Sequence, residues 1–145
     1  GLFTLLLFTD EAMAFSPHLV YLAVLVLASH VMFGDAAVHV WGLRANGLSG
    51  DAFGNRPDPY VKVWCAGVNG GRTETIKDTH SPNWAAEFNF PSCKPKSTLR
   101  MEVWDQDISK YDLLSTCNYT FGSGSKPNAK CSLKKGSLYF NYTAK

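Results

Sequence analysis

Three aspartates lie close together directly after a strand-like segment. Asp105, Asp107 and Asp112 follow Leu99–Val103, in which apolar residues alternate with charged ones. This period-2 pattern predicts a strand with its apolar residues on the buried face. Carboxylates crowded at one end of a sheet repel one another unless a hard cation takes their oxygens as ligands, and Ca²⁺ prefers about 6–8 oxygen ligands in flexible geometry. The loop therefore favours a calcium site, although Asp and Ser are also ordinary residues of a solvated turn.

A second acidic segment precedes another predicted strand. Asp51 lies in a loop rich in Gly and Pro, and Asp58 stands between two prolines just before the predicted strand Tyr60–Cys65. A proline restricts the residue before it to extended conformations, which would pre-position the Asp58 carboxylate. Two such loops can meet at one end of a β-sandwich. Together they would supply five metal ligands: Asp51, Asp58, Asp105, Asp107 and Asp112.

The elements that must position these aspartates are short strands. We expect roughly eight of them in residues 37–145, with no convincing amphipathic helix, beginning with Ala37–Leu43. Asn69-Gly70-Gly71 predicts a tight turn because such residues tolerate positive φ, and residues 72–76 would return as the next strand. Trp84–Phe90 predicts an aromatic strand with Trp84 in the core, residues 121–128 a long turn, and Ser137–Tyr142 the last strand. This profile is typical of an all-β, eight-stranded antiparallel Greek-key β-sandwich.

The first 36 residues differ in composition from the rest. Met13 is a possible natural start, and residues 19–33 form an almost unbroken apolar run of 15 residues followed by small residues. Such a run is shorter than the roughly 20 residues that span a bilayer and is typical of a secretory signal. We therefore expect residues 1–36 to be a signal-peptide region and residues 37–145 a single domain. An uncleaved membrane anchor is the alternative, because no Lys or Arg precedes the run.

All four cysteines lie after the predicted signal. An even number of cysteines in a secreted chain of this size favours two disulfides, with three possible pairings. No C-x-x-C pair is present, which argues against a zinc site. Four free buried thiols in a cytosolic protein are the alternative. The residues concerned are Cys65, Cys93, Cys117 and Cys131.

The predicted domain is basic once the first 36 residues are set aside. Residues 37–145 contain 14 Lys and Arg against 9 Asp and Glu, a formal charge of +5. Five of the nine acidic residues are the candidate metal ligands, so the remaining surface would attract anionic partners. The basic residues are spread along the chain without a recognised nucleic-acid motif, which argues against nucleic-acid binding.

Several motifs, in order and in spacing, resemble the loops and strands of C2 domains. They are Asp51, Asp58–Val63, Ser81–Trp84 with Glu87–Phe90, and Val103–Asp107. Further similarity, at Asp112–Cys117, Cys131–Leu133 and Gly136–Phe140, is to the C-terminal C2 domain of perforins. The resemblance covers roughly residues 37–145. One spacing departs from the family. The third loop of the family reads D-x-D-x5-D, whereas this chain reads D-x-D-x4-D, so Asp112 stands one residue closer to Asp107 than the corresponding carboxylate of the family does.

The resemblance implies a function and further residue roles. Perforin-like domains have a disulfide matching Cys117 and Cys131, which leaves Cys65 with Cys93. The family binds phospholipid membranes when Ca²⁺ neutralises its acidic loops, and apolar loop tips then enter the membrane interface. By position, the membrane-contact residues would be Leu48, Phe53, Ile108 and Tyr111. Asn118-Tyr-Thr and Asn141-Tyr-Thr match the acceptor pattern for N-glycosylation.

We therefore expect a secreted, monomeric, calcium-dependent module that binds anionic phospholipid membranes peripherally, with no small-molecule substrate. Because the predicted signal directly precedes the sandwich, the module would be free-standing, and the resemblance implies an innate-immune or antimicrobial role. A structural or protein-binding sandwich with vestigial calcium loops is the alternative. A hydrolase using acidic residues is a weaker one, because no Gly-x-Ser-x-Gly is present and only His39 and His80 remain in the predicted mature chain.

Overall fold

The computed structural model describes residues 37–51, 53–107 and 110–145, which contain eight strands and no helix. The predicted signal region, Met13 and Ile108 lie outside the described residues. Within the described part there is thus no helix that is long and apolar enough to cross a membrane. The strands are β1 (Val38–Asn46), β2 (Pro59–Cys65), β3 (Val68–Arg72), β4 (Phe88–Phe90), β5 (Thr98–Gln106), β6 (Tyr111–Thr120), β7 (Gly124–Ser132) and β8 (Ser137–Ala144).

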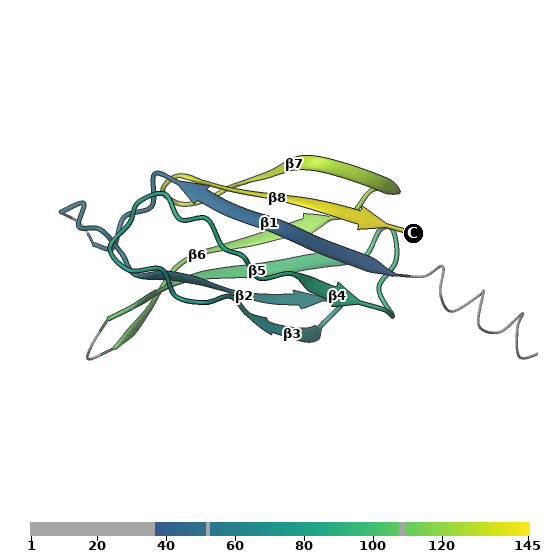
Figure 1. Ribbon diagram of the computed structural model, residues 1–145, viewed down its shortest axis with the longest axis horizontal. Helices are drawn as coiled ribbons and strands as arrows, with labels where there is room; N and C mark the ends of the chain where they lie inside the picture. The colour runs from purple at the N-terminus through teal and green to yellow at the C-terminus, as the bar shows by residue number, and fades with distance from the viewer. Residues whose placement is uncertain (1–36, 52, 108–109) are drawn as a thin grey trace, which may run out of the picture. The chain divides into compact units, whose positions relative to one another are not determined.

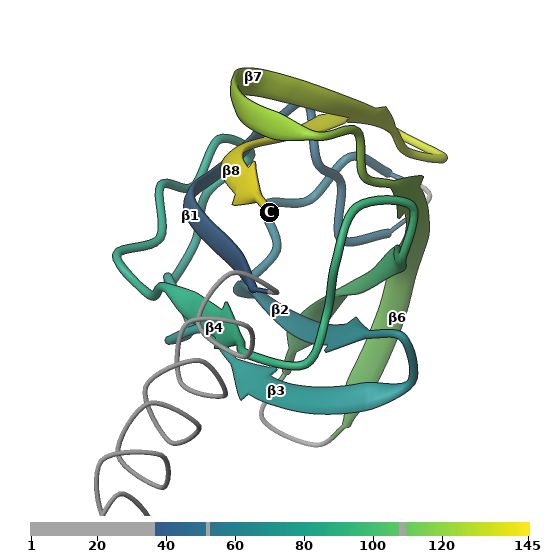
Figure 2. The ribbon, with the colours of Figure 1, turned by 90° about the vertical axis from the view of Figure 1, so that its right-hand side faces the viewer.

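The strands form two antiparallel four-stranded sheets that face each other (Figures 1 and 2). One sheet has the order β4-β1-β8-β7 and the other β3-β2-β5-β6. Both sheets contain strands that are distant in sequence, as β1 pairs with β8 and β2 with β5. The predicted all-β Greek-key sandwich is confirmed.

Side-chain alternation places the core between the sheets. In β1, Val38 and Val40 are fully buried, as the pattern predicted, and Leu99 and Met101 in β5 are equally buried. Trp84 is also in the core, where its indole N–H donates to the carbonyl of Pro59 at 3.2 Å. The disulfides Cys65–Cys93 and Cys117–Cys131 are both present, which confirms two bridges with the pairing that the family resemblance implied.

Four predicted local features are wrong. The turn between β2 and β3 lies at Ala66-Gly67, both with positive φ, so Asn69-Gly70-Gly71 belongs to β3 and not to a turn. The strand predicted over residues 72–76 is absent beyond Arg72, where β3 ends. Only residues 88–90 of the predicted aromatic strand pair as β4. The predicted long turn at 121–128 is mostly strand, because β7 begins at Gly124 and pairs with β8. At residues 69–71 and 124–128, hairpin pairing of β3 with β2 and of β7 with β8 overrode the local turn signal. Residues 84–87, in contrast, do not pair as a strand despite their aromatic and apolar residues.

Four connections gather at one end of the sandwich, at the left in Figure 1. The β1–β2 loop contacts the β3–β4 loop through the Leu48 N–H and the His80 carbonyl at 3.0 Å. It also meets the β7–β8 turn, where a Cβ on Gly136 would lie 2.0 Å from the carbonyl oxygen of Asn46. Gly136 has φ +82°, so both its conformation and this close approach require glycine. We call this end the loop pole.

Candidate calcium site

Asp58 joins the β1–β2 loop to the β3–β4 loop and to the end of β5 at the loop pole. Its backbone N–H donates to Asp105 Oδ1 at 2.8 Å, and its carbonyl accepts from the N–H of Gln106 at 2.9 Å. Its own Oδ1 accepts from the N–H of Asp78 at 2.7 Å. Pairing of Pro59 with Asp105 between β2 and β5 fixes this register. The two acidic segments that the sequence separates by about 50 residues therefore lie side by side, as predicted.

The Asp51 carboxylate organises the loop that follows it. Its Oδ1 accepts the backbone N–H groups of Phe53 at 2.8 Å and Asn55 at 3.1 Å, and its Oδ2 accepts the Asn55 side-chain amide at 2.5 Å. The hydrogen bond from the Asn55 backbone is the main cause that lowers the pKa of Asp51. Asp51 is thus ionised at neutral pH on an exposed loop. Asn55, which sequence reasoning missed, holds it in place.

Asp105 is the most deeply placed of the five carboxylates. Its side chain is buried, with the residue only 3% exposed. Burial raises the pKa of Asp105, and the negative charges of Asp107, Asp58 and Asp112 raise it further, while the hydrogen bond from Asp58 acts in the opposite direction. A buried carboxylate among other carboxylates is costly to ionise without a cation.

A polar hollow of ≈ 330 Å³ lies between the loops. Four of the predicted ligands line it. Asp58 does not line it but donates its backbone N–H to Asp105, which does. Gly50 forms part of the wall, where a Cβ would lie 2.8 Å from Asp105 Oδ2. Lys110 also borders the hollow, with its Nζ 3.7 Å from Asp112 Oδ2. The charged lining residues are Asp51, Asp105, Asp107 and Asp112 together with Arg56 and Lys110.

The donor set fits a hard divalent cation, although the side chains are not drawn together around one point. Among residues 37–51, 53–107 and 110–145, no group of three or more His, Cys, Asp or Glu is arranged as a metal cluster. Instead, Asp51 and Asp58 accept backbone N–H groups and Asp112 pairs with Lys110. The buried charge of Asp105 and the room left by Gly50 are the observations that favour a cation here.

The predicted loop-tip residues differ in exposure. Phe53 is 91% exposed and Tyr111 60% exposed, whereas Leu48 is only 2% exposed. The prediction that Leu48 is a membrane-contact residue is therefore wrong. The backbone N–H and carbonyl of Leu48 both bond to His80, and this pulls the start of the loop into the core. Leu113, which sequence reasoning did not single out, is 48% exposed beside the loops.

The two predicted glycosylation acceptors have different surroundings. Asn118 is exposed on β6. Asn141 is half-buried on β8, and its Oδ1 accepts the backbone N–H of Asn128 at 3.0 Å. Its amide nitrogen also lies 2.6 Å from where a Cβ on Gly42 would be. Of the two, Asn118 has the more accessible side chain, and glycosylation of both stays a prediction.

The outer face of the second sheet presents cations stacked on aromatic rings. Lys62 Nζ lies 4.5 Å from the ring centroid of Trp104, and the Arg100 guanidinium lies 4.3 Å from that of Trp64. Contacts of this kind are worth about 0.5–1 kcal/mol at exposed sites. These contacts hold the cations of this face in an ordered arrangement.

Comparisons with known proteins match this geometry. The family description "C2 domain" matches residues 36–135. Perforin-1 of Homo sapiens is 37% identical over 115 residues, which are 77% of this chain and 20% of perforin-1, and perforin-1 of Mus musculus is 32% identical over the same shares. The chain thus spans about a fifth of the length of these relatives.

Solved structures agree with the sequence comparisons. A structure described as "Structure of a C2 domain" has a TM-score of 0.65 and 32% identity, and the match covers 74% of this chain and 95% of that one. A C2 domain of a plant extended synaptotagmin 1 has a TM-score of 0.62 at 21% identity, covering 77% of this chain and 95% of that one, which supports the fold alone. The chain belongs to the C2 domain family and is related to the perforins.

Proposed function

We propose that this domain binds membranes rich in anionic phospholipid when Ca²⁺ occupies the loop pole. The observation that carries the proposal is a polar hollow lined by four aspartates from distant parts of the chain. Asp58 is hydrogen-bonded to one of them, and the exposed Phe53 and Tyr111 are close in sequence to the lining residues. Asp51, Asp105, Asp107 and Asp112 would be ligands from the hollow. Asp58 would join them by releasing the N–H of Asp78.

Charge explains why the cation would act as a switch. The five aspartates contribute a formal charge of −5 against +2 from Arg56 and Lys110 beside the hollow, and the remaining negative charge repels anionic headgroups. Bound Ca²⁺ supplies compensating positive charge together with open coordination positions for phosphate oxygens. The aromatic side chains of Phe53 and Tyr111 would then enter the interface, where burial of a large apolar side chain contributes about 1.5–3 kcal/mol.

Localisation outside the cell is part of the proposal. Two disulfides are the form of stabilisation that small domains use in oxidising compartments. The predicted signal region and the exposed acceptor Asn118 are consistent with secretion. An innate-immune or antimicrobial role follows only from the similarity to perforin-1, of which this chain matches a fifth.

Sedimentation with vesicles tests the function. Residues 37–145, which hold both sheets, the core between them and both disulfides, are mixed with phosphatidylserine or phosphatidylcholine vesicles in Ca²⁺ or in chelator. We expect pelleting with phosphatidylserine in Ca²⁺ and release by chelator. Binding that is indifferent to chelator, or no binding, would contradict the proposal and leave a protein-binding sandwich as the alternative.

Variants of the acidic loop locate the site. Asp105→Ala and Asp107→Ala should abolish calcium-dependent pelleting while the far-ultraviolet circular dichroism stays unchanged. Glu87→Gln is the matched control, because it removes one exposed negative charge that pairs with His39 away from the loop pole. Equal loss of binding in the control would contradict our ligand assignment.

A further inference from the structure

A second hollow of ≈ 170 Å³ adjoins the acidic one and has the opposite character. Its lining is mainly apolar, and two lysines of the β7–β8 turn border it. It shares Gly50 and Asp51 with the acidic hollow, so the two lie side by side at the loop pole. We call it the leucine pocket; its principal lining residues are Leu48, Leu113, Leu114, Ser115, Lys134 and Lys135.

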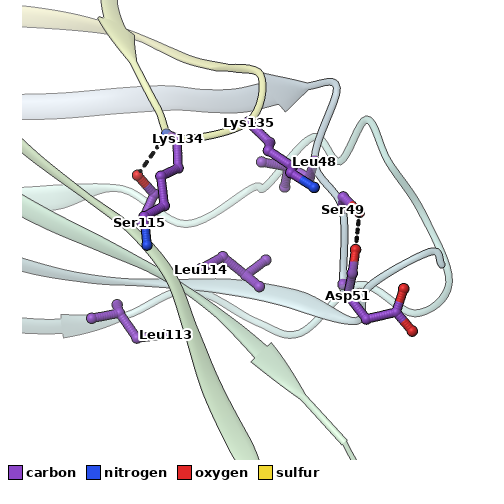
Figure 3. A pocket seen from close by; sticks show the side chains of 9 residues that line it. Leu48, Ser49, Asp51, Leu113, Leu114, Ser115, Lys134 and Lys135 are labelled. Carbon is purple, nitrogen blue, oxygen red and sulfur yellow. Dashed lines mark hydrogen bonds between the residues drawn. The ribbon is translucent and has the colours of Figure 1, made fainter. Parts of the chain in front are cut away.

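The turn that bears the lysines is held firmly in place. The backbone N–H of Lys134 donates to Ser115 Oγ at 3.0 Å, which ties the turn to β6. Gly136 packs against the backbone of the β1–β2 loop, which fixes the other side of the turn. Figure 3 shows the two side chains extending from the turn, Lys134 toward Leu114 and Lys135 toward Leu48. Because the backbone of the turn is fixed, both lysine side chains start from the border of the pocket.

No carboxylate pairs with these two lysines in the described part of the chain, where the ion pairs involve other residues. Asp51 borders the pocket, but hydrogen bonds from Phe53 and Asn55 hold its carboxylate, and Figure 3 shows it directed away from the lysines. Two exposed cations above an apolar floor are complementary to an amphipathic anion.

We propose that the leucine pocket binds an anionic phospholipid, with its phosphate on Lys134 and Lys135 and the first carbons of an acyl chain against Leu113 and Leu114. An apolar cavity of about 150 Å³ holds a benzene-sized guest, so ≈ 170 Å³ accommodates a segment of about six carbons. Leu113, 48% exposed, forms the open side through which the chain enters. The inference rests on the proposed membrane function, since it adds a second lipid contact beside the calcium site.

This contact needs no calcium. The two lysines attract a phosphate without a bound cation, whereas the acidic hollow attracts phosphate only when a cation is bound. The pocket would therefore hold one lipid at the loop pole before calcium arrives. It would also explain how a pole with five aspartates approaches an anionic membrane in the first place.

Nuclear magnetic resonance of residues 37–145 with dihexanoylphosphatidylserine tests the inference, because its six-carbon chains match the pocket. We expect shifts of the Leu113 and Leu114 methyl signals and of the Lys134 amide, in chelator as well as in Ca²⁺. Inorganic phosphate should shift the lysine signals without the methyls, and dihexanoylphosphatidylcholine should bind more weakly.

The double variant K134Q/K135Q should weaken this binding about tenfold or more, because charge-assisted hydrogen bonds to phosphate are lost. The matched control is K94Q/K96Q, which removes the same charge from the loop between β4 and β5, beside Phe121 and away from the loop pole. Unchanged methyl signals, equal weakening in the control, or shifts that follow protein concentration rather than lipid would overturn the inference.

The failure of this inference is distinguishable from failure of the proposed function. Calcium titration is followed at the amides of Asp105 and Asp107, and membrane binding by vesicle sedimentation. If Asp105 and Asp107 do not respond to calcium and vesicles do not pellet the domain, while the lipid still shifts the Leu113 and Leu114 methyl signals in chelator, only the calcium switch is contradicted. If calcium binding and vesicle binding are both observed but the lipid does not shift the Leu113 and Leu114 methyl signals, only the leucine pocket is contradicted.

Discussion

Replacing Asp105 with Asn separates two effects of the buried carboxylate: its destabilisation of the fold without metal and its proposed binding of Ca²⁺. The side chain keeps its shape. In the parent, the backbone nitrogen of Asp58 lies 2.8 Å from Asp105 Oδ1, and the Oδ1 of Asn can accept the same hydrogen bond. Burial and three neighbouring carboxylates raise the pKa of Asp105, so its ionised form is disfavoured in the folded protein without metal. In chelator at neutral pH, Asp105→Asn should therefore be at least as stable as the parent.

In Ca²⁺ the order of stability should reverse, with the parent more stable than Asp105→Asn. Extracellular calcium modules have dissociation constants of about 10⁻⁴–10⁻³ M. At about 10 mM Ca²⁺, one such site stabilises the folded state by about 1.4–2.7 kcal/mol, equivalent to about 5–10 °C in the midpoint of thermal unfolding for a domain of this size. Asp105→Asn should lose this stabilisation.

Differential scanning calorimetry with and without chelator measures both effects. Glu87→Gln serves as the control, since it removes an exposed charge and should keep the full calcium-induced rise in midpoint. The reasoning is refuted if calcium stabilises Asp105→Asn as much as the parent. It is also refuted if the chelated variant is clearly less stable, because the carboxylate would then hold the fold together without metal.

Three further predictions concern other parts of the domain. Phe53→Ala should weaken vesicle binding roughly tenfold to hundredfold with calcium affinity unchanged, because Phe53 is 91% exposed; equal vesicle affinity would contradict its insertion. Removing the Cys117–Cys131 bridge, of sequence separation 14, with alanine at both positions should lower the free energy of unfolding in urea by about 3 kcal/mol, and no loss would contradict its stabilising role. Burial raises the pKa of Tyr119 to about 12 from 10.0, so the native state retains a proton that the unfolded chain releases between those values, and the free energy of unfolding should fall with pH in that window. Tyr119→Phe should make that fall shallower, which denaturation below and within the window measures; an unchanged slope would rule out Tyr119 as its source.

Local pattern was enough for the class of fold and for where the acidic residues fall relative to the strands. Alternation buried Val38 and Val40 in β1 and Leu99 and Met101 in β5, as expected. Period-2 alternation predicts which face of a strand is apolar, and without a predicted helix to cover that face it is buried against a second sheet. The motif order then placed Asp58 and Asp105 at strand ends, and these strands pair directly.

Local pattern failed at two places. Gly70 and Gly71 look like turn residues but pair with β2 as part of β3, because the hairpin turns earlier, at Ala66-Gly67. Leu48 is drawn inward by a contact with His80, which lies 32 residues away in sequence. Such contacts depend on which loops the topology brings to the same pole, and residues far apart in sequence leave no local signal of that.

The sequence by itself determined that carboxylates would accumulate at strand ends, because residue type and alternation are local properties. Only the tertiary structure decided that Asp105 would be buried while Asp51 stayed exposed. The same is true of the leucine pocket, where β6 and the β7–β8 turn bring Leu114 and Lys134 together. Burial and juxtaposition are set by the packing of two sheets and four loops, which is a property of the whole domain.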